Sequence, residues 1–436
     1  MKWLLFRRPF SELCHAGRLL RIVTCLDSST STWPRATTAR VHPLPKPVPN
    51  PAIEAKARRY ISLGNRVKQQ LGPTNAEDLR AELADDFEFV APLIGPLGKE
   101  PLVAATTGLD LASGLPNFDA RYHDFRADPD DEHRIWCTMR VMATHTGVLN
   151  FGGVRAEPKA PPTVVKSPPE AVSLRFDPVS GQLVELTTGY PLDRRCGSTG
   201  GLGGLFGILE GLGYPLPSLL TRPTGVVLAP LLRPFKLSLP TAAEDETKPR
   251  PTAGDDERLP DEKLLELAAA LHAANFGAAD PSLLAERFEF CGPVVGPLPK
   301  SPFIGALGAM RIAEGLPDLD YNVRDAVVCE HDTNRVWYTS APRGTHTAML
   351  SLFGKQHAPT GRTWESPPER GSMTFDRDGK CIALTGGYIM DRRLGNTDGL
   401  GGVYGLCHAL GLPTPTPAWL LRTPTQNWAR ITGGGS

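Results

Sequence analysis

The chain has 436 residues, more than one ordinary hydrophobic core supports, so two domains are expected. It carries 47 basic and 47 acidic residues, and this balance excludes the strongly basic surface with which proteins wrap nucleic acid. No run approaches the roughly 18 apolar residues that a membrane-spanning helix needs. The eight cysteines form no CxxC pair, which argues against a disulfide framework and favours a reducing compartment.

Residues 1–50 have the composition of a targeting segment. Arginines are frequent, the acidic residues are Glu12 and Asp27, and a hydroxyl cluster at 28–32 precedes a proline-rich run. Arginine-rich, hydroxyl-rich and acid-poor composition is typical of an organellar transit peptide. We expect an organellar protein, with a plastid favoured over a mitochondrion. The alternative is a disordered tail on a cytoplasmic protein.

The elements expected in a first domain, residues 51–235, begin with helices and end with strands. A capping box at Thr74 and Glu77 starts the second helix. The expected helices are 53–71, 74–84, 99–112 and 205–212, and the expected strands are 88–91, 120–126, 134–146, 171–177 and 183–192.

The first domain is repeated after a linker at 236–258, which is rich in Pro, Thr and acidic residues. The second domain is expected at 259–436. The segment G-Y-x-x-D-R-R-x-G-x-T-x-G-L-G-G occurs twice, and so do E-F-x-x-P-x-x-G-P, T-H-T and S-P-P-E. These pairs stay in register, so the two halves share one architecture. The first of each pair begins at 189, 88, 144 and 167, and the second at 387, 289, 345 and 366.

The element order and the paired motifs resemble the nuclear transport factor 2-like (SnoaL-like) superfamily, and in particular an uncharacterised algal branch of it. The resemblance covers residues 75–215 and 276–415. It implies an α+β fold of two tandem cone-shaped domains, each with three N-terminal helices packed in a strongly bent antiparallel sheet. Such a cone encloses an apolar pocket. The superfamily includes isomerases, dehydratases, cyclases and non-enzymatic binding domains, so the fold does not select an activity.

A histidine and a tyrosine in each half are the candidate catalytic residues. Strict alternation along strand 134–146 places His145 at the end of an inward-facing row, and alternation along 183–192 places Tyr190 on an inward row. His346 and Tyr388 are their counterparts. An imidazole there could act as a general acid or base. The alternative is a core histidine whose nitrogens are satisfied by threonine hydroxyls or carbonyls.

The lining of the second half is expected to be the more polar one, because Tyr338 and Ser340 stand where the first half has Cys137 and Met139. We therefore expect the open pocket in the second half, with Tyr338 and Ser340 as ligand-binding residues.

The two D-R-R segments suggest an anion site. Two guanidinium groups per copy lie beside the start of a glycine-rich segment, where free backbone N–H groups are expected. These candidate ligand-binding residues are Arg194, Arg195, Arg392 and Arg393. The alternative is that they pair with acidic residues across the domain.

The glycine spacing departs from the dinucleotide fingerprint, and the histidines form no metal-binding motif, so neither a cofactor nor a metal is expected.

The sequence favours a protein that binds a small molecule or another protein, with its two domains paired within the chain or as a homodimer. A small apolar compound is the expected small-molecule ligand. No nucleic-acid partner is expected. Trp136 and Trp337 are expected at the contact between the paired domains. The alternative is an isomerase, cyclase or dehydratase that acts on a small apolar carbonyl compound through the histidine and tyrosine pairs.

Overall fold

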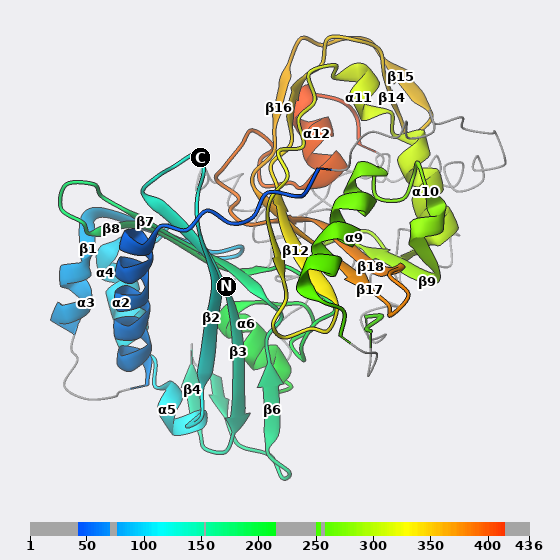
Figure 1. The fold of residues 1–436 in the computed structure, drawn as a ribbon. Coiled ribbons are helices and arrows are strands. Elements are labelled where there is room, and N and C mark those ends of the chain that lie inside the picture. Colours follow the sequence, from blue (N-terminus) through cyan, green and yellow to red (C-terminus); the bar gives the residue numbers. More distant parts are fainter. Residues whose placement is uncertain (1–41, 70–75, 152–153, 215–249, 254–257, 415–436) are drawn as a thin grey trace, which may run out of the picture.

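The computed structural model describes residues 42–69, 76–151, 154–214, 250–253 and 258–414, which form two sheet-rich halves (Figure 1). The expected transit segment before residue 42, the capping residue Thr74 and most of the linker lie outside the described residues. No helix within the described ranges is long and apolar enough to cross a membrane.

The first half follows the expected order, with short additional strands. Its helices are α2 (Pro51–Lys68), α3 (Ala76–Glu82), α4 (Lys99–Thr107), α5 (Leu111–Gly114) and α6 (Gly204–Gly211). Its strands are β1 (Leu83–Val90), β2 (Asp119–Ala127), β3 (Arg134–His145), β4 (Leu149–Phe151), β5 (Val154–Ala156), β6 (Thr163–Lys166), β7 (Glu170–Phe176) and β8 (Leu183–Pro191). The helix expected at 99–112 is interrupted at Gly108, and β4, β5 and β6 were not predicted because each has only three or four residues.

The second half has an equivalent series of elements. Its helices are α9 (Asp261–Ala273), η4 (Pro281–Leu283), α10 (Lys300–Ala309), α11 (Ile312–Gly315) and α12 (Gly402–Leu410). Its strands are β9 (Leu284–Cys291), β10 (Leu298–Pro299), β11 (Arg324–Val328), β12 (Arg335–Ser340), β13 (Arg343–Thr345), β14 (Leu350–Leu352), β15 (Lys355–His357), β16 (Thr363–Glu365), β17 (Glu369–Phe375) and β18 (Cys381–Ile389).

The two main sheets have the same strand order. The first is β1-β8-β7-β3-β2 with β6 on β3, and the second is β10-β9-β18-β17-β12-β11. The expectation of wholly antiparallel sheets was wrong, because β1 pairs in parallel with β8 and β9 in parallel with β18. Two strands so far apart in the chain are not joined by a hairpin, and a long connection allows parallel pairing.

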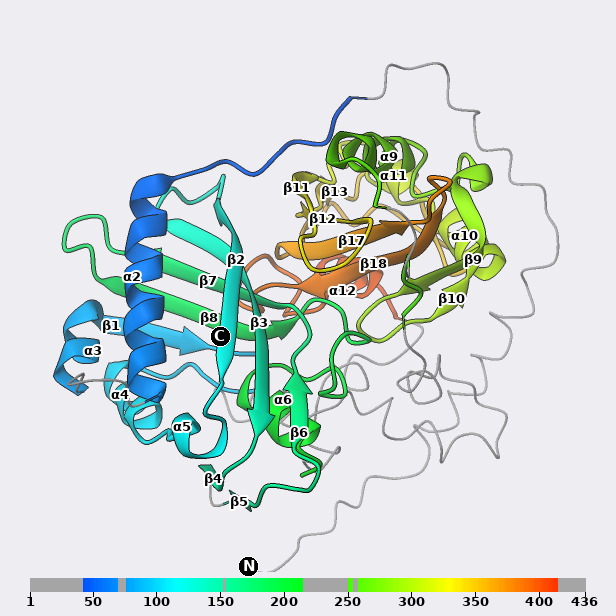
Figure 2. The ribbon, with the colours of Figure 1, turned by 60° about the horizontal axis from the view of Figure 1, so that its bottom comes forward.

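Helix α2 packs across one face of the first sheet (Figure 2). Asn50 caps it by accepting a hydrogen bond from the Ile53 N–H, and Pro51 occupies its first turn. Its buried side includes Ile53, Ala57 and Tyr60, which join the core of the first half. The core thus lies between the helices and the sheet.

The long strand β3 has no unbroken counterpart in the second half. Its equivalent ends at Ser340 in β12 and resumes at Arg343 in β13. Pro342 stands in the gap, and proline cannot donate a hydrogen bond to a neighbouring strand.

Residues 42–50, which we expected in the N-terminal tail, form an extended strap that contacts both halves (Figure 1). The Pro45 carbonyl accepts from the Ala326 N–H at 2.9 Å, and the Val48 carbonyl accepts from the Ala127 N–H at 3.0 Å. Leu44 joins the core of the second half. The strap therefore supplies part of a core that lies more than 200 residues away in the sequence.

A buried glutamate in each half holds the glycine-rich segment. Glu170 Oε2 accepts from the Gly204 N–H at 2.9 Å, and Glu369 Oε1 accepts from the Gly402 N–H at 2.6 Å. These glycines begin helices α6 and α12. The last residue of the S-P-P-E motif thus satisfies a free N–H group at a helix start.

Truncation of Leu44 should lower the stability of the second half. We expect Leu44→Ala to reduce the free energy of unfolding by about 2 kcal/mol, because the side chain is 9% exposed and joins a distant core. Urea unfolding measures the change. Val48→Ala is the control, since Val48 is 56% exposed on the same strap and should change stability by less than about 0.5 kcal/mol. Equal effects of the two substitutions would contradict the assignment of Leu44 to the core.

Glu170 should make stability fall as the pH rises through the weakly acidic range. Burial raises the pKa of this carboxyl to about 7, and the Gly204 N–H opposes that shift. Between its ordinary pKa of about 4.5 and pH 7, the folded protein holds a proton that the unfolded chain has released, so the folded state loses stability by about 3 kcal/mol. Glu170→Gln keeps an acceptor for Gly204 and should remove this loss.

We expect Glu170→Gln to be more stable than the wild type at pH 8, with the advantage absent near pH 4.5. Urea unfolding across this range measures it, and Glu157→Gln, at an exposed site, is the control. A stability difference between wild type and Glu170→Gln that does not change with pH would contradict the expectation.

Candidate functional site

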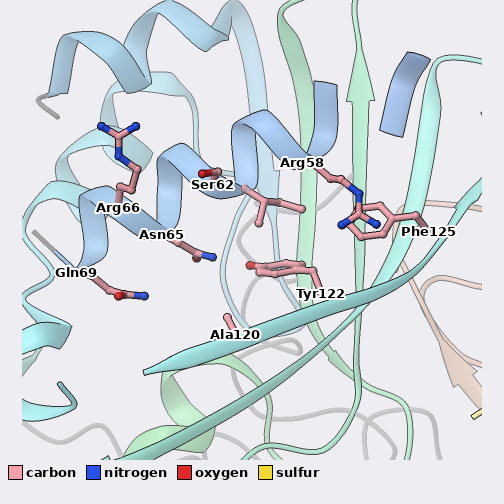
Figure 3. Close-up of a pocket in the computed structure, with 9 residues that line it drawn as sticks. Arg58, Ser62, Asn65, Arg66, Gln69, Ala120, Tyr122 and Phe125 are labelled. Carbon is pink, nitrogen blue, oxygen red and sulfur yellow. The ribbon is translucent and has the colours of Figure 1, made fainter. Parts of the chain in front are cut away.

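A groove of about 370 Å³ opens in the first half between helix α2 and strand β2 (Figure 3). The helix contributes residues at helical spacing, and the strand contributes an aromatic pair. The lining residues are Arg58, Ile61, Ser62, Asn65, Arg66, Gln69, Ala120, Tyr122 and Phe125. The groove therefore combines aromatic surface with hydroxyl, amide and guanidinium groups, and no carboxylate lines it.

The two ends of the groove differ in character. At one end the Arg58 guanidinium lies 3.9 Å from the centre of the Phe125 ring and hydrogen-bonds Glu54 at 2.8 Å. At the other end Gln69 donates to the Phe118 carbonyl at 3.3 Å. Arg66 is exposed and lines the groove from α2, with its guanidinium turned away from Tyr122 (Figure 3). Arg58 is paired with Glu54, so the net positive charge of the lining comes from Arg66, and this charge favours a ligand that carries negative charge or strong acceptors.

Tyr122 joins the groove to the core. Its ring lies under α2 with the hydroxyl end on the side of Asn65 (Figure 3). Burial raises the pKa of this hydroxyl above its ordinary value, and the nearby Cys137 and Glu170 add to the shift. The hydroxyl therefore stays protonated at neutral pH and can both donate and accept a hydrogen bond.

The second half does not repeat this groove lining, and its expected polar pocket residues lie elsewhere. Tyr338 is buried in the core, stacks on Phe276 and lies against Gly371. A Cβ on Gly371 would meet the Tyr338 ring at 2.4 Å, so the glycine makes room for it. The equivalent first-half positions hold Cys137 and Val172, which pair across β3 and β7 as Tyr338 and Gly371 pair across β12 and β17. Tyr338 thus fills its half, and the groove found lies in the first half.

The structure does not bring His145 and Tyr190 together. Tyr190 pairs with Ala171, and Ala171 pairs with Thr138, seven residues before His145 on strand β3. At 3.3 Å per residue this offset is about 23 Å. The second half repeats this separation. Arg370 pairs with Tyr388 on one neighbouring strand and with Thr339 on the other, and His346 lies seven residues after Thr339.

The expectation that Tyr190 faces inward was wrong because a bulge reverses the face of β8. Ala171 pairs with Tyr190 and Ser173 pairs with Thr187, so an advance of two residues along β7 matches an advance of three along β8. Gly189, inside this bulge, has a φ of 84°. Gly387 makes the same bulge in β18 with a φ of 80°. An extra residue in one strand shifts the alternation of side chains by one. Both tyrosines consequently leave the core and face the other half.

The buried histidines sit where their strands end. Thr360 is the partner of His346 Nδ1, with its hydroxyl at 3.1 Å and its N–H at 3.3 Å. Burial lowers the pKa of both His346 and His145. The Thr360 contact is of the kind that the structural alternative predicts for His346, whereas Nε2 of both histidines has no hydrogen-bond partner within the described ranges. Ser340 ends β12 and pairs with Glu369 in the sheet.

The tyrosines make reciprocal hydrogen bonds between the halves. Tyr190 Oη accepts from the Arg392 N–H at 3.2 Å, and Tyr388 Oη accepts from the Arg194 N–H at 3.2 Å. Burial raises the pKa of both hydroxyls. Trp136 and Trp337 pack in the same apolar cluster with side chains of both halves, as expected.

The first arginine of each D-R-R segment donates hydrogen bonds to a loop of the other half. Arg194 donates through Nε to the Gly292 carbonyl at 3.0 Å and through Nη2 to the Gly296 carbonyl at 2.7 Å. Arg392 Nη2 donates to the Gly95 carbonyl at 2.9 Å. These carbonyls belong to the two E-F-x-x-P-x-x-G-P segments. The repeated motifs therefore recognise each other across the contact.

The second arginine and the aspartate complete this contact. Arg195 pairs with Glu289 at 2.8 Å, and its counterpart Arg393 lies 3.4 Å from Glu88. Asp391 Oδ2 accepts from the Thr187 hydroxyl at 2.6 Å. Arg195 and Arg393 thus pair with acidic residues, as the alternative to an anion site has it, whereas Arg194 and Arg392 bind backbone carbonyls instead.

The groove residues were missed in the sequence although part of their signal was present. Arg58, Ser62, Asn65 and Gln69 recur at three or four residues along α2, beside the row of side chains that the helix buries. What the sequence does not show is that this polar row faces Tyr122, more than fifty residues later. No group of His, Cys, Asp or Glu side chains that could hold a metal occurs in the part of the chain that the structure describes.

Comparison with known proteins gives distant structural similarity. No family model and no curated protein matches the chain. It is similar to AclR, a putative hydroxylase from Streptomyces galilaeus, with 18% identity over 38% of this chain and 87% of that chain, at a TM-score of 0.26. It is also similar to a putative SnoaL-like polyketide cyclase from Jannaschia, with 15% identity over 32% of this chain and 88% of that one, at a TM-score of 0.25. A phenazine biosynthesis-related protein from Pseudomonas aeruginosa matches with 14% identity over 40% and 91%, at a TM-score of 0.24.

A double-mutant cycle should show that Tyr388 and His346 act independently. Tyr388→Phe removes the acceptor for the Arg194 N–H and should cost about 1 kcal/mol of folding free energy. His346→Asn leaves Thr360 without its partner and should cost about 1–3 kcal/mol. Because the two sites share no hydrogen bond, the costs should add to within about 0.5 kcal/mol. Chemical denaturation of both single variants and the double variant measures this, and a coupling above about 1 kcal/mol would show one shared site.

Proposed function

We propose that this protein binds a small organic molecule in the groove between α2 and β2 of its first half. The observation that carries the proposal is the groove of about 370 Å³, with Tyr122 and Phe125 on one wall and polar α2 side chains on the other. Small-molecule sites commonly combine apolar surface with a few convergent polar groups. In this proposal the second half pairs with the first within the chain and serves as its structural partner.

The lining chemistry favours a ligand with a flat apolar part and an acceptor-rich or anionic group. Phe125 and Tyr122 offer ring surface, and Arg66, Asn65 and Ser62 offer hydrogen-bond donors. A purely apolar ligand, as the sequence suggested, would make no hydrogen bond to these donors and would cover the half-buried Asn65 without giving it a partner. We therefore propose a polar aromatic or similarly planar molecule.

Binding is favoured over the isomerase, cyclase or dehydratase alternative by the groups that the groove contains. General acid–base chemistry needs a side chain that titrates near neutral pH, most often a histidine or a carboxylate. The lining set holds neither, and burial raises the pKa of the Tyr122 hydroxyl. The His145–Tyr190 and His346–Tyr388 pairs are apart in the structure.

The proposal is tested by native mass spectrometry of the purified protein, followed by titration with the molecule released from it. We expect one ligand per chain. Arg66→Gln should weaken its binding about 10-fold or more, because one charge-assisted contact is typically worth about 1.5–3 kcal/mol. Arg59→Gln is the matched control, because Arg59 lies on the same helix outside the groove and pairs with Glu82. Asn65→Phe, which should fill the groove, is expected to abolish binding.

Equal affinity of Arg66→Gln, Asn65→Phe and wild type for the released molecule would place the site elsewhere. Thermal unfolding shows whether each variant is folded before its affinity is interpreted.

A further inference from the structure

Three arginines are buried together where strands of the two halves meet. Arg126 lies on β2, Arg324 on β11 and Arg370 on β17, and they are 1%, 8% and 0% exposed. Arg126 Nη1 donates to the Asp124 carbonyl at 2.9 Å. Arg370 Nη1 donates to the Asp325 carbonyl at 3.1 Å. The two guanidinium groups thus make equivalent contacts to the two halves.

Most of the remaining donors of these arginines are unsatisfied. Nearby carboxylates lie beyond hydrogen-bond geometry: Arg126 Nε is 3.5 Å from Asp325, and Arg370 Nη2 is 3.6 Å from Asp124. Arg324 is 3.6 Å from Asp130 and 4.0 Å from Asp325. The buried guanidinium nitrogens without a hydrogen-bond partner among the described residues are Nε and Nη2 of Arg126, Nε and Nη2 of Arg370, and Nε and Nη1 of Arg324. Buried donors are rarely left in this state, because each costs about 1–3 kcal/mol.

The cluster also carries an excess of positive charge. Asp124 and Asp325 are its buried carboxylates, with side chains 16% and 6% exposed, whereas Asp130 is 66% exposed. Three buried cations therefore face two largely buried anions. Burial and the nearby Arg126 together lower the pKa of Arg370 to about 9, although Asp124 and Asp325 oppose the shift. A single additional negative charge would balance the cluster.

The equivalent positions of the two halves show that the fold does not need these arginines. Arg126 pairs with Trp136 as Val327 pairs with Trp337, and Arg370 pairs with Thr339 as Ala171 pairs with Thr138. Val327 and Ala171 belong to the apolar cluster of the contact. The pair Arg126 and Arg370 therefore has an equivalent pair, Val327 and Ala171, in which each residue comes from the opposite half. One pair is cationic and the other is apolar. Apolar replacement of buried charges is often neutral or stabilising, so the arginines call for another reason.

We propose that a small inorganic anion binds between Arg126 and Arg370, with Arg324 at the edge of the site. The unsatisfied Nε and Nη2 atoms form the edge of a guanidinium group that binds an oxyanion bidentately, and they also suit a halide. The arginines come from both halves, so the bound anion stabilises their association. This site is separate from the groove and does not depend on the proposed function.

The test uses the full chain, dialysed into a buffer whose only anion is a large sulfonate. Thermal unfolding is followed while chloride or phosphate is added at constant ionic strength. We expect a saturable rise in Tm of about 2–5 °C, because a ligand that binds only the folded state stabilises it by mass action. A response to one anion alone identifies it as a halide or an oxyanion. A Tm that follows ionic strength without saturation, or does not change, overturns the proposal.

The matched variant is the double substitution Arg126→Val and Arg370→Ala, which installs the residues of the equivalent positions. We expect it to fold and to lose the saturable response, whereas Arg59→Gln, at an exposed site of α2 outside the groove, should keep it. Retention by the double variant, or loss in Arg59→Gln, would overturn the assignment. Line broadening of ³⁵Cl in NMR of the wild type, reversed by phosphate if the oxyanion competes, gives a second measurement that requires no variant. If neither this broadening nor a response of Tm to phosphate is observed, the proposal is overturned.

Discussion

The structure depends on the reciprocal contact between the D-R-R segment of each half and the E-F-x-x-P-x-x-G-P loop of the other. Arg194 and Arg392 donate to loop carbonyls, and Tyr190 and Tyr388 accept from the opposite backbone. These groups are buried or nearly so, and each bond satisfies a polar group that would otherwise lose its contact with water. The motifs that stand out as repeated in the sequence are therefore the ones that recognise each other, and this explains their pairing without a shared catalytic centre.

Symmetry of the backbone and asymmetry of the side chains divide the roles of the halves. Cys137 with Val172 in one half, and Tyr338 with Gly371 in the other, fill equivalent positions with opposite distributions of volume. Val323 stands in the second half where Tyr122 lines the groove of the first. A duplicated fold can change in this way because each half keeps a packed interior while the residues that line the first-half groove are free to differ. Architecture is shared, and the proposed binding chemistry is confined to the first half.

Periodicity in the sequence predicts the main strands and helices well, because side-chain alternation and helical spacing are local properties. It fails where one residue changes the phase. The bulge at Gly189 reverses the face of Tyr190, and strict alternation cannot reveal a positive φ in advance. The strap and the groove were missed for a different reason. Leu44 and the α2 face of the groove are completed by residues far along the chain, and no local pattern records which distant element they meet.

Buried charges explain how strongly the second half depends on the first. Arg134 pairs with Glu185 inside its own half at 2.6 Å, but the equivalent of Glu185 is Ala383, as their pairing with Glu88 and Glu289 shows. Arg335 instead pairs with Asp193 of the other half at 2.7 Å, with both side chains fully buried, and with Asp332 of its own half at 3.0 Å. Removing Asp193 would leave the fully buried Arg335 with the partly exposed Asp332 as its partner, which is destabilising. The shortest ion pair of this arginine therefore forms only when the halves are together, and Leu44 of the strap is a second contact on which the second half depends.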